Sequence, residues 1–579
     1  MIHKIRMIFT RKQKVKFLIL FIILFMGSLL EFMGVSLILP FVELVMEPDG
    51  DSGFLSILGN VFHTGSGREL LFVTGCLLIT VYILKNIYLL GMKYVQLRFV
   101  FNNRLELSGR LMRSYMKKPY TFHLEKNSSE ILRSVTADVN NLYDLIMDGI
   151  DLLSNLLVMG MLAVFLLWMD PLITLVVIGL LGFCSAFYFW LMRGRTESYG
   201  KQNQIYNSLM IQAVNQAMGG IKEIKILSRE DYFVRAYEEN GRQYASSLKR
   251  SKLLQVLPRY FIETICVCGI LTMVLVKLYL GTEVQELVPQ LSVFAVAAFR
   301  LLPSVNQVNH LLSNMLFLKP SIDKIYDDLK AVGVEKNQKV PGEDYERLPD
   351  ADAIHVSHVS FRYPGSDTDI LSDVSVDLPL GESIGFIGSS GAGKTTFMDL
   401  LLGLLTPDKG AVGYGDCDIR DYGRAWGRKL GYIPQSIYLA DDTIRRNVAF
   451  GIPDSRIEEE QVWKALREAQ LSEYVQGLEQ GLDTVIGESG VRLSGGQRQR
   501  IGIARALYQE PEILVLDEAT SALDSETEHA VMEAVENLRG SCTLLMIAHR
   551  TSTLHACDRI YRVEDGKVCP VMRTGSGTF

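Results

Sequence analysis

The chain has 579 residues, of which 48% are hydrophobic and only 21% are charged, and its mean hydropathy is +0.17. The apolar residues gather in long runs before residue 320, which excludes a disordered, fibrous or fully soluble chain and indicates a membrane domain followed by a soluble one. The net charge of −6 provides no general basic surface, so we expect no nucleic-acid partner.

The membrane part contains six segments that are apolar for about the 20 residues that a helix needs to cross a bilayer. Each carries at most one formal charge, and the fifth is short. They are residues 17–42, 70–90, 152–169, 171–192, 260–276 and 287–318. The apolar stretch of the first is longer than that of a cleaved signal peptide, so we expect it to remain as a membrane span.

Lysine and arginine are unevenly distributed around these segments. The first 16 residues hold six of them and no acid, namely Lys4, Arg6, Arg11, Lys12, Lys14 and Lys16. The connections after the first, third and fifth segments are acidic instead, which predicts a cytoplasmic N-terminus. Six spans return the C-terminus to the cytoplasm, and the long charged stretches 91–151 and 193–259 extend the spans on that side.

A polar linker at 330–352 precedes a region in which apolar and polar residues alternate between glycine-rich turns. Within it, GSSGAGKTT at 388–396 matches the P-loop pattern, follows an apolar strand at 383–387 and opens a helix. The glycines let backbone N–H groups close around phosphate oxygens, and the helix dipole adds to this attraction. We expect Lys394 to reach the β- and γ-phosphates and Thr395 to hold Mg²⁺.

A second apolar strand, 513–516, ends in Asp517 and Glu518. In a nucleotide-hydrolysing site Asp517 would act through Mg²⁺, and Glu518 would orient and deprotonate the attacking water. Two acids after a strand are weak evidence by themselves, because the same pair also occurs at the N-terminus of a helix.

Between these two elements lies LSGGQ at 493–497, and with it the chain resembles the ATP-binding-cassette (ABC) transporters. The resemblance implies that Tyr363 stacks on adenine, that Gln435 is the Q-loop glutamine and that His549 contacts the γ-phosphate. It also relates 487–490 to the exporter X-loop and 521–524 to the D-loop. The motifs cover about 230 C-terminal residues, follow the family's order and, with six spans, imply an exporter half-transporter of the type IV fold.

The resemblance implies three sets of site residues. The catalytic residues are Glu518, His549 and Gln435. The nucleotide-binding residues are Tyr363, Gly388, Ser389, Ser390, Gly391, Ala392, Gly393, Lys394, Thr395, Thr396, Ser494, Gly495, Gly496 and Gln497. The Mg²⁺ ligands are Thr395, Gln435 and Asp517. ATP and Mg²⁺ are therefore the expected cofactors.

The predicted fold is a multi-domain membrane protein with a six-helix transmembrane domain and an α/β P-loop NTPase cassette. We expect the transmembrane domain at residues 1–329, the linker at 330–352 and the ATP-binding domain at 353–579. In this family the signature of one subunit completes the site on the P-loop of the other, so a single chain completes no site. Because the P-loop, the signature, Glu518 and His549 are all intact, we expect a homodimer.

Two cytoplasmic stretches resemble coupling helices, which would transmit cassette closure to the spans. They are residues 127–140 and residues 219–230. The alternative is that they form solvated charged helices.

Three cations mark a candidate substrate path: Lys85 and Arg300 within the second and sixth segments, and Arg259 at the start of the fifth. Intramembrane charges are costly, and these three suit an anionic headgroup such as a phosphate or pyrophosphate. The alternative is pairing with Glu31 and Glu263, the acids inside the spans.

These cations, together with an expected amphipathic external helix at 54–62, resemble the PglK-type flippases of lipid-linked oligosaccharides. Lys85 departs from the pattern, because the resemblance implies an arginine at this position and lysine lacks the bidentate fork of a guanidinium group.

The chain is thus expected to be an ATPase-coupled transporter that moves an amphiphilic anionic lipid, such as a lipid-linked oligosaccharide, from the cytoplasmic to the outer leaflet. Its expected location is the bacterial inner membrane, with both termini in the cytoplasm. The alternatives are a multidrug or peptide exporter and an ATP-gated channel or regulator.

Overall fold

The computed structural model describes residues 4, 7, 9–36, 67–169, 171–279, 284–335, 347–517, 533, 535–547 and 557–571, although within α12 the side chains of 284–300 are not described. The chain divides into two compact units. One comprises Met1–Lys118 and Lys126–Val334, and the other comprises Pro119–Glu125 and Glu335–Phe579. The expected external helix at 54–62 lies outside the described residues.

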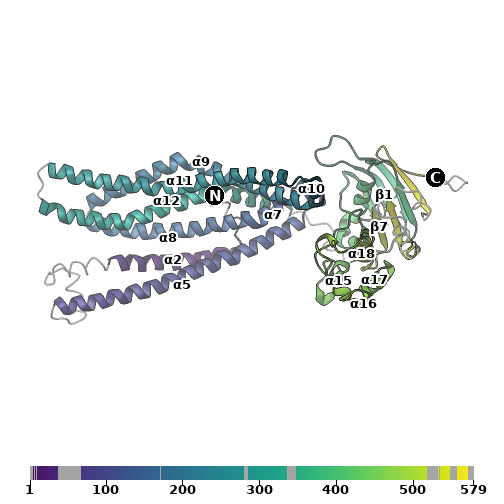
Figure 1. Ribbon diagram of the computed structural model, residues 1–579, viewed down its shortest axis with the longest axis horizontal. Coiled ribbons are helices and arrows are strands. Elements are labelled where there is room, and N and C mark those ends of the chain that lie inside the picture. Colours follow the sequence, from purple (N-terminus) through teal and green to yellow (C-terminus); the bar gives the residue numbers. More distant parts are fainter. Residues whose placement is uncertain are drawn as a thin grey trace. The chain divides into compact units, whose positions relative to one another are not determined.

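The first unit is built from long helices that run alongside one another (Figure 1). They are α2 (Arg11–Ser36), α5 (Gly67–Met116), α8 (Val139–Met169), α9 (Pro171–Gly219), α11 (Glu230–Tyr279) and α12 (Val284–Glu335). Helix α2 packs on α5 and α8, and α9 packs on α11. Each of the six predicted segments falls on one of these helices, although the structure describes the first only as far as Ser36.

In the part of the chain that the structure describes, four helical stretches are long and apolar enough to cross a membrane. They are Arg11–Gly34, Leu71–Met116, Ser128–Phe165 and Val177–Gly219. Large apolar side chains point outward from these stretches, as Leu90 and Trp190 do with 75% of their surface exposed. An apolar outer surface suits contact with lipid, where every backbone polar group must be bonded inside the helix.

Short elements join the cytoplasmic ends predicted for these helices. They are α6 (Tyr120–Glu125), α7 (Ser128–Arg133), the π-helix η1 (Ser134–Asp138) and α10 (Ile221–Leu227). Asn127 caps α7 by accepting a hydrogen bond from the backbone N–H of Ser129, as short polar side chains do at a helix N-terminus.

The predicted coupling segment 127–140 lies one element away from the residues that group with the cassette. Segment 127–140 forms α7, η1 and the start of α8 inside the first unit, with Ser129, Arg133 and Asp138 buried. Residues Pro119–Glu125, which contain α6, belong to the second unit instead. The second predicted segment, 219–230, contains α10 and stays with the long helices.

The second unit contains two sheets. The first is antiparallel, in the order β2 (Leu371–Pro379), β1 (Ala353–Phe361), β4 (Lys409–Tyr414) and β5 (Cys417–Asp418). The second has the order β10 (Lys567–Pro570), β9 (Arg559–Glu564), β3 (Ser383–Ile387), β8 (Thr543–Ile547), β7 (Ile513–Asp517) and β6 (Leu430–Ile433). All pairs in the second sheet are parallel except β9 with β10, so the carboxyl ends of β3 and β7 lie at one edge.

Helices and short 3₁₀ turns connect these strands. They are α13 (Lys394–Leu401), η2 (Ile419–Tyr422), α14 (Gly423–Lys429), α15 (Ile444–Val448), η3 (Asp454–Arg456), α16 (Glu459–Glu468), α17 (Ser472–Gln476), η4 (Gly481–Asp483), η5 (Glu488–Gly490) and α18 (Gly495–Leu507).

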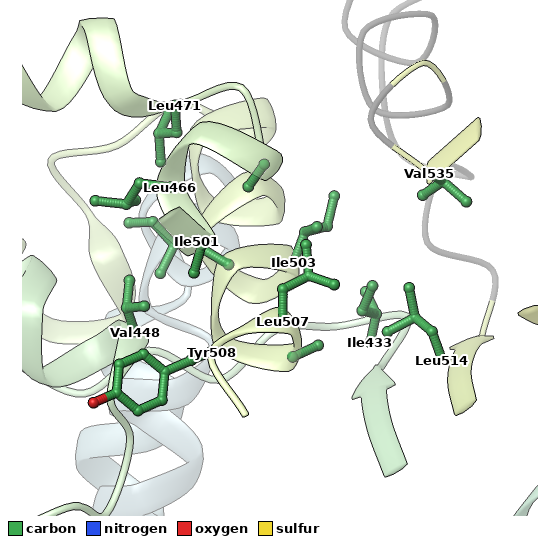
Figure 2. Close-up of a cluster of buried hydrophobic side chains, with 14 of the residues drawn as sticks. Ile433, Val448, Leu466, Leu471, Ile501, Ile503, Leu507, Tyr508, Leu514 and Val535 are labelled. Atoms are coloured by element: carbon green, nitrogen blue, oxygen red, sulfur yellow. The ribbon is translucent and has the colours of Figure 1, made fainter. Parts of the chain in front are cut away.

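One apolar core joins α18 to the large sheet. Figure 2 shows Ile501, Ile503 and Leu507 of α18 among side chains from β6, β7 and the neighbouring helices. Ile501 and Ile503 are fully buried, as are Ile433 of β6 and Leu514 of β7. Because a buried aliphatic side chain contributes about 1.5–3 kcal/mol, this core fixes α18 and its N-terminus relative to the sheet.

Candidate functional site

The predicted P-loop connects β3 to α13 at the carboxyl edge of the parallel sheet. Two of its glycines are required by close approach or by conformation. A Cβ on Gly388 would lie 2.3 Å from the carbonyl oxygen of Val563, and Gly393 has φ +97° at the N-terminus of α13. An L side chain strains such a conformation, so these positions let the loop turn back over the start of the helix.

Lys394 is the first residue of α13 and is buried. Its Nζ donates hydrogen bonds to the carbonyl oxygens of Gly388 and Ser389, both at 2.9 Å. Ser389, Ser390 and Gly391 are exposed. A cation wrapped by an exposed loop at a helix N-terminus is a suitable partner for a phosphate group.

Asp517, predicted to act through Mg²⁺, ends β7 and is 7% exposed. Asp399 of α13 lies close to it. Burial, and then the negative charge of Asp517, raise the pKa of Asp399 to about 6. The carboxyl edge of the sheet therefore holds two buried acids near the P-loop, where a positive ion would relieve their repulsion.

The residues at this edge of the sheet fit a bound Mg²⁺. Magnesium prefers oxygen ligands and keeps several of its waters. Thr395 presents an exposed hydroxyl at the start of α13, and Asp517 ends the neighbouring part of the sheet. Bound there, Mg²⁺ would supply positive charge that neutralises the phosphates of a nucleotide.

Tyr363, predicted to stack on adenine, lies beside α13 because its hydroxyl is 3.2 Å from Oγ1 of Thr396. Its ring meets that of Phe361 edge-on, with ring centroids 5.1 Å apart. Gln435 lies on the exposed segment that follows β6. Both residues therefore belong to the unit that carries the P-loop.

The LSGGQ segment forms the N-terminus of α18. Ser494 and Gln497 make a capping box: the Gln497 backbone N–H donates to Oγ of Ser494 at 3.2 Å, and the Ser494 N–H donates to Oε1 of Gln497 at 2.8 Å. Ser494 and Gly495 are exposed, whereas Gly496 is buried. Gln497, predicted to bind nucleotide, thus uses its amide oxygen within its own helix N-terminus.

Several predicted site residues lie outside the described part of the chain. Glu518 follows directly after β7, and His549 follows β8 by two residues. The expected D-loop at 521–524 also lies outside the described residues.

The structure also brings together three residues that sequence reasoning did not include. They are Asp399, Tyr432 of β6 and Tyr120 of α6. Burial raises the pKa of Tyr432, with contributions from Asp517, Asp399 and Tyr120, and burial followed by Asp399 raises that of Tyr120. The sequence signal for Asp399 is an acid inside the apolar run of α13. The sequence carries no comparable signal for Tyr432 or Tyr120.

The predicted substrate cations occupy different environments in the helical unit. Lys85 is half-buried, with its Nζ 4.5 Å from the centroid of the Tyr82 ring. Arg259 is exposed and follows Pro258 inside α11. Among described side chains, neither pairs with Glu31 or Glu263. Arg300 lies on α12, but its side chain is not described.

Comparisons with known proteins cover both units. A model of the ABC transporter family matches residues 371–521, and a model of the ABC transporter transmembrane region matches residues 15–297. The chain is 31% identical over 485 residues to an "ATP-dependent lipid A-core flippase" of Burkholderia pseudomallei (strain 1710b), an alignment that covers 82% of this chain and 78% of the relative.

Two further comparisons extend over more of the chain. An "ATP-dependent lipid A-core flippase" of Coxiella burnetii is 29% identical over 536 residues, covering 90% of this chain and 87% of the relative. A solved structure of a bacterial Atm1-family ABC exporter with ATP bound aligns with a TM-score of 0.72 at 20% identity, covering 96% of this chain and 94% of the other. The last likeness concerns the fold.

Proposed function

This chain belongs to the ABC transporter family and is an ATP-driven exporter, and from that premise we propose that it flips an anionic, lipid-linked oligosaccharide from the cytoplasmic to the outer leaflet. The observation that carries the ATP-driven part is the buried Lys394 ammonium, held by two loop carbonyls at the edge of the parallel sheet. The same chain supplies helices long and apolar enough to cross a membrane.

The cassette is proposed to bind and hydrolyse ATP with its motif residues. The P-loop backbone and Lys394 bind the phosphates of ATP, and Tyr363 packs against the adenine. Thr395, Asp517 and Gln435 supply Mg²⁺ ligands. Glu518 would orient the attacking water, and His549 would contact the γ-phosphate.

A second copy of the chain completes each ATP site in this proposal. Half-transporters of the family work as dimers, and the N-terminus of α18 presents the exposed Ser494 and Gly495. Because each chain holds one P-loop and one such terminus, a homodimer forms two equivalent sites by two-fold symmetry. ATP drives transport by binding the closed arrangement of the cassettes more tightly than the open one.

The lipid part of the proposal rests on the relatives and on charge. The relatives from Burkholderia pseudomallei and Coxiella burnetii are named as ATP-dependent lipid A-core flippases. Lys85, Arg259 and Arg300 would attract the phosphate of an anionic headgroup from each protomer. The proposed location is the bacterial inner membrane, with both termini in the cytoplasm.

Within the unit that carries the cassette, α6 is proposed to respond to nucleotide. Pro119–Glu125 groups with the cassette, and Tyr120 lies near Asp399 of the P-loop helix. A movement of α13 on nucleotide binding would thus reach α6.

Transport of chemically matched lipids tests this function. Proteoliposomes would hold either a polyprenyl-pyrophosphate oligosaccharide or a phosphate-free glycolipid of equal chain length, and an external glycosidase would report the exposed sugar. We expect ATP-dependent exposure of the pyrophosphate lipid. Hydrolysis of ATP without exposure of either lipid would contradict the proposal and leave an exporter of another amphiphile.

A further inference from the structure

A polar cavity of about 220 Å³ opens among the long helices of the first unit. Glu31 of α2, Lys93 and Gln96 of α5, Asp151 and Asn155 of α8, and Gln307 of α12 line it. All these elements belong to one compact unit, so a single protomer builds the cavity. Glu31, Asn155 and Gln307 come from predicted spans, where polar side chains are costly, and the other three come from the adjoining stretch 91–151; their convergence on one cavity points to a ligand.

Gln96 gives the second, independent sign of a ligand. Its side chain is 1% exposed, and its Oε1 has no hydrogen-bond partner in the part of the chain that the structure describes. A buried acceptor left without a donor costs about 1–3 kcal/mol. Gln96 lines the cavity, so a donor group that reached its Oε1 from there would recover this free energy.

The charges around the cavity disfavour an anion. Nζ of Lys93 is 2.9 Å and 3.1 Å from the two carboxylate oxygens of Asp151, so these two charges compensate each other. Glu31 adds a further negative charge, and among described side chains it has no ion-pair partner. The lining therefore offers carboxylate and amide acceptors to a group that donates hydrogen bonds.

The volume of the cavity limits the size of the group that it can hold. Cavities that enclose a whole drug-sized ligand have volumes of about 300–1,000 Å³. A volume of about 220 Å³ is smaller than that, yet it far exceeds the space of one water. It suits one ring-sized group with several hydroxyls.

We propose that this cavity binds one sugar ring of the transported headgroup, through its hydroxyls, and excludes the phosphate. The proposal rests on the proposed function and specifies its substrate: sugar and phosphate are recognised at separate places in each protomer. Lys85 supplies the neighbouring cation, because a Cβ built on Gly34 would lie 3.6 Å from its Nζ. Gly34 is three residues after Glu31 on α2, which is a rise of about 4.5 Å.

Photo-labelling of the full chain in lipid nanodiscs tests the inference. The probes are dodecyl glucoside, dodecyl phosphate and dodecylamine, each with a diazirine next to its headgroup. We expect the glucoside to label the cavity residues Met92 and Val158 about fivefold more than the phosphate does, and an excess of unmodified dodecyl glucoside to suppress the labelling. Equal or stronger labelling by the phosphate, or preferential labelling by the amine, would overturn it.

Two glutamine variants provide a matched pair. Gln96→Met should lower glucoside labelling about fivefold, the equivalent of one neutral hydrogen bond, without lowering the unfolding temperature of the ligand-free protein. Gln13→Met is the control, because Gln13 is equally buried in the bundle but donates to Asn103 at 3.2 Å and to Glu106 at 3.1 Å. It should lower the unfolding temperature and leave labelling unchanged.

The labelling readout separates this inference from the proposed function. If Gln96→Met leaves glucoside labelling unchanged while the unaltered protein still flips the pyrophosphate lipid, the sugar cavity is refuted and the proposed function stands. If the unaltered protein flips no glycolipid, the proposed function fails, and site-specific, Gln96-dependent glucoside labelling still decides whether the cavity recognises a sugar.

Discussion

The cassette and the helical unit differ in the surfaces that they expose and in the polar groups that they bury. In the cassette most of the fully buried side chains are aliphatic, such as Ile433, Leu466 and Ile501, all at 0% exposure. In the helical unit Leu90 and Trp190 expose 75% of their surface, whereas Gln96 and Asn309 are 1% and 3% exposed. The first pattern is what water imposes, and the second is what lipid permits.

The difference determines where function can be recognised. In the cassette, apolar packing fixes the sheet, and the functional groups stand at the strand ends in a local motif. In the helical unit, apolar packing against lipid provides no such contrast, so isolated buried polar residues carry the specificity.

The strongest test of the cassette is Lys394→Met. Loss of the ammonium that the P-loop carbonyls hold should lower ATP hydrolysis about 100-fold or more. Steady-state phosphate release from the full chain in nanodiscs measures it. Lys429→Met is the control, because Lys429 pairs with Glu512 at 2.6 Å away from the loop, and it should retain hydrolysis. Unchanged hydrolysis in Lys394→Met would remove the loop from the ATP site.

The close approach of the P-loop backbone to the neighbouring strand is tested by Gly388→Ala. The added Cβ would lie 2.3 Å from the Val563 carbonyl oxygen, so we expect the cassette to lose about 3 kcal/mol of stability. Gly391 also has a positive φ, +82° against +156° at Gly388, but an added Cβ would have no heavy atom within 4 Å, so Gly391→Ala should lose about 1 kcal/mol. Thermal unfolding of both variants measures the difference, and equal losses would show that close approach is unimportant.

Asp399→Asn tests the acid pair through pH. The folded-state pKa of Asp399, about 6, lies above its ordinary value of 3.8, so its proton is held more tightly in the folded state. Stability therefore falls as pH rises between these values and stays lower above them. Relative to the unaltered protein, the variant should gain about 1 kcal/mol at pH 4.5 and about 3 kcal/mol at pH 7.5.

Denaturant unfolding without nucleotide or Mg²⁺ provides the measurement for Asp399→Asn. A gain that does not depend on pH would show that Asp399 is not protonated in the folded cassette near pH 5.

The smallest effect is expected in the helical unit. Asn309 of α12 donates a hydrogen bond to Oγ of Ser185 of α9 at 3.0 Å. A double-mutant cycle with Asn309→Ala and Ser185→Ala should give a coupling of about 0.6 kcal/mol, typical of hydrogen bonds between membrane helices. A coupling above about 2 kcal/mol would mean that the bundle depends on this polar contact as the cassette depends on its core.

The sequence allowed prediction wherever function is local along the chain. The P-loop at 388–396 and the signature at 493–497 each lie on one strand–loop–helix or loop–helix unit, and the structure forms these units. The fold class was likewise predictable. The apolar segments have the length of a membrane span, and apolar and polar residues alternate in the cassette.

Other features depend on contacts between residues distant in sequence. The grouping of Pro119–Glu125 with the cassette joins parts of the chain that are more than 200 residues apart, and the sequence gives no sign of it. The proximity of Asp399 to Asp517 is also set by the order of strands. The orphan acceptor of Gln96 becomes visible only when its neighbours are known.

The central claim is that ATP bound at the P-loop drives lipid movement. The most direct measurement records ATP hydrolysis and exposure of a pyrophosphate-linked oligosaccharide in the same proteoliposomes, for the unaltered protein, Lys394→Met and Glu518→Gln. We predict that both signals are present in the unaltered protein and that both are lost in each variant. Lipid exposure that persists in either variant after hydrolysis has stopped would contradict the account.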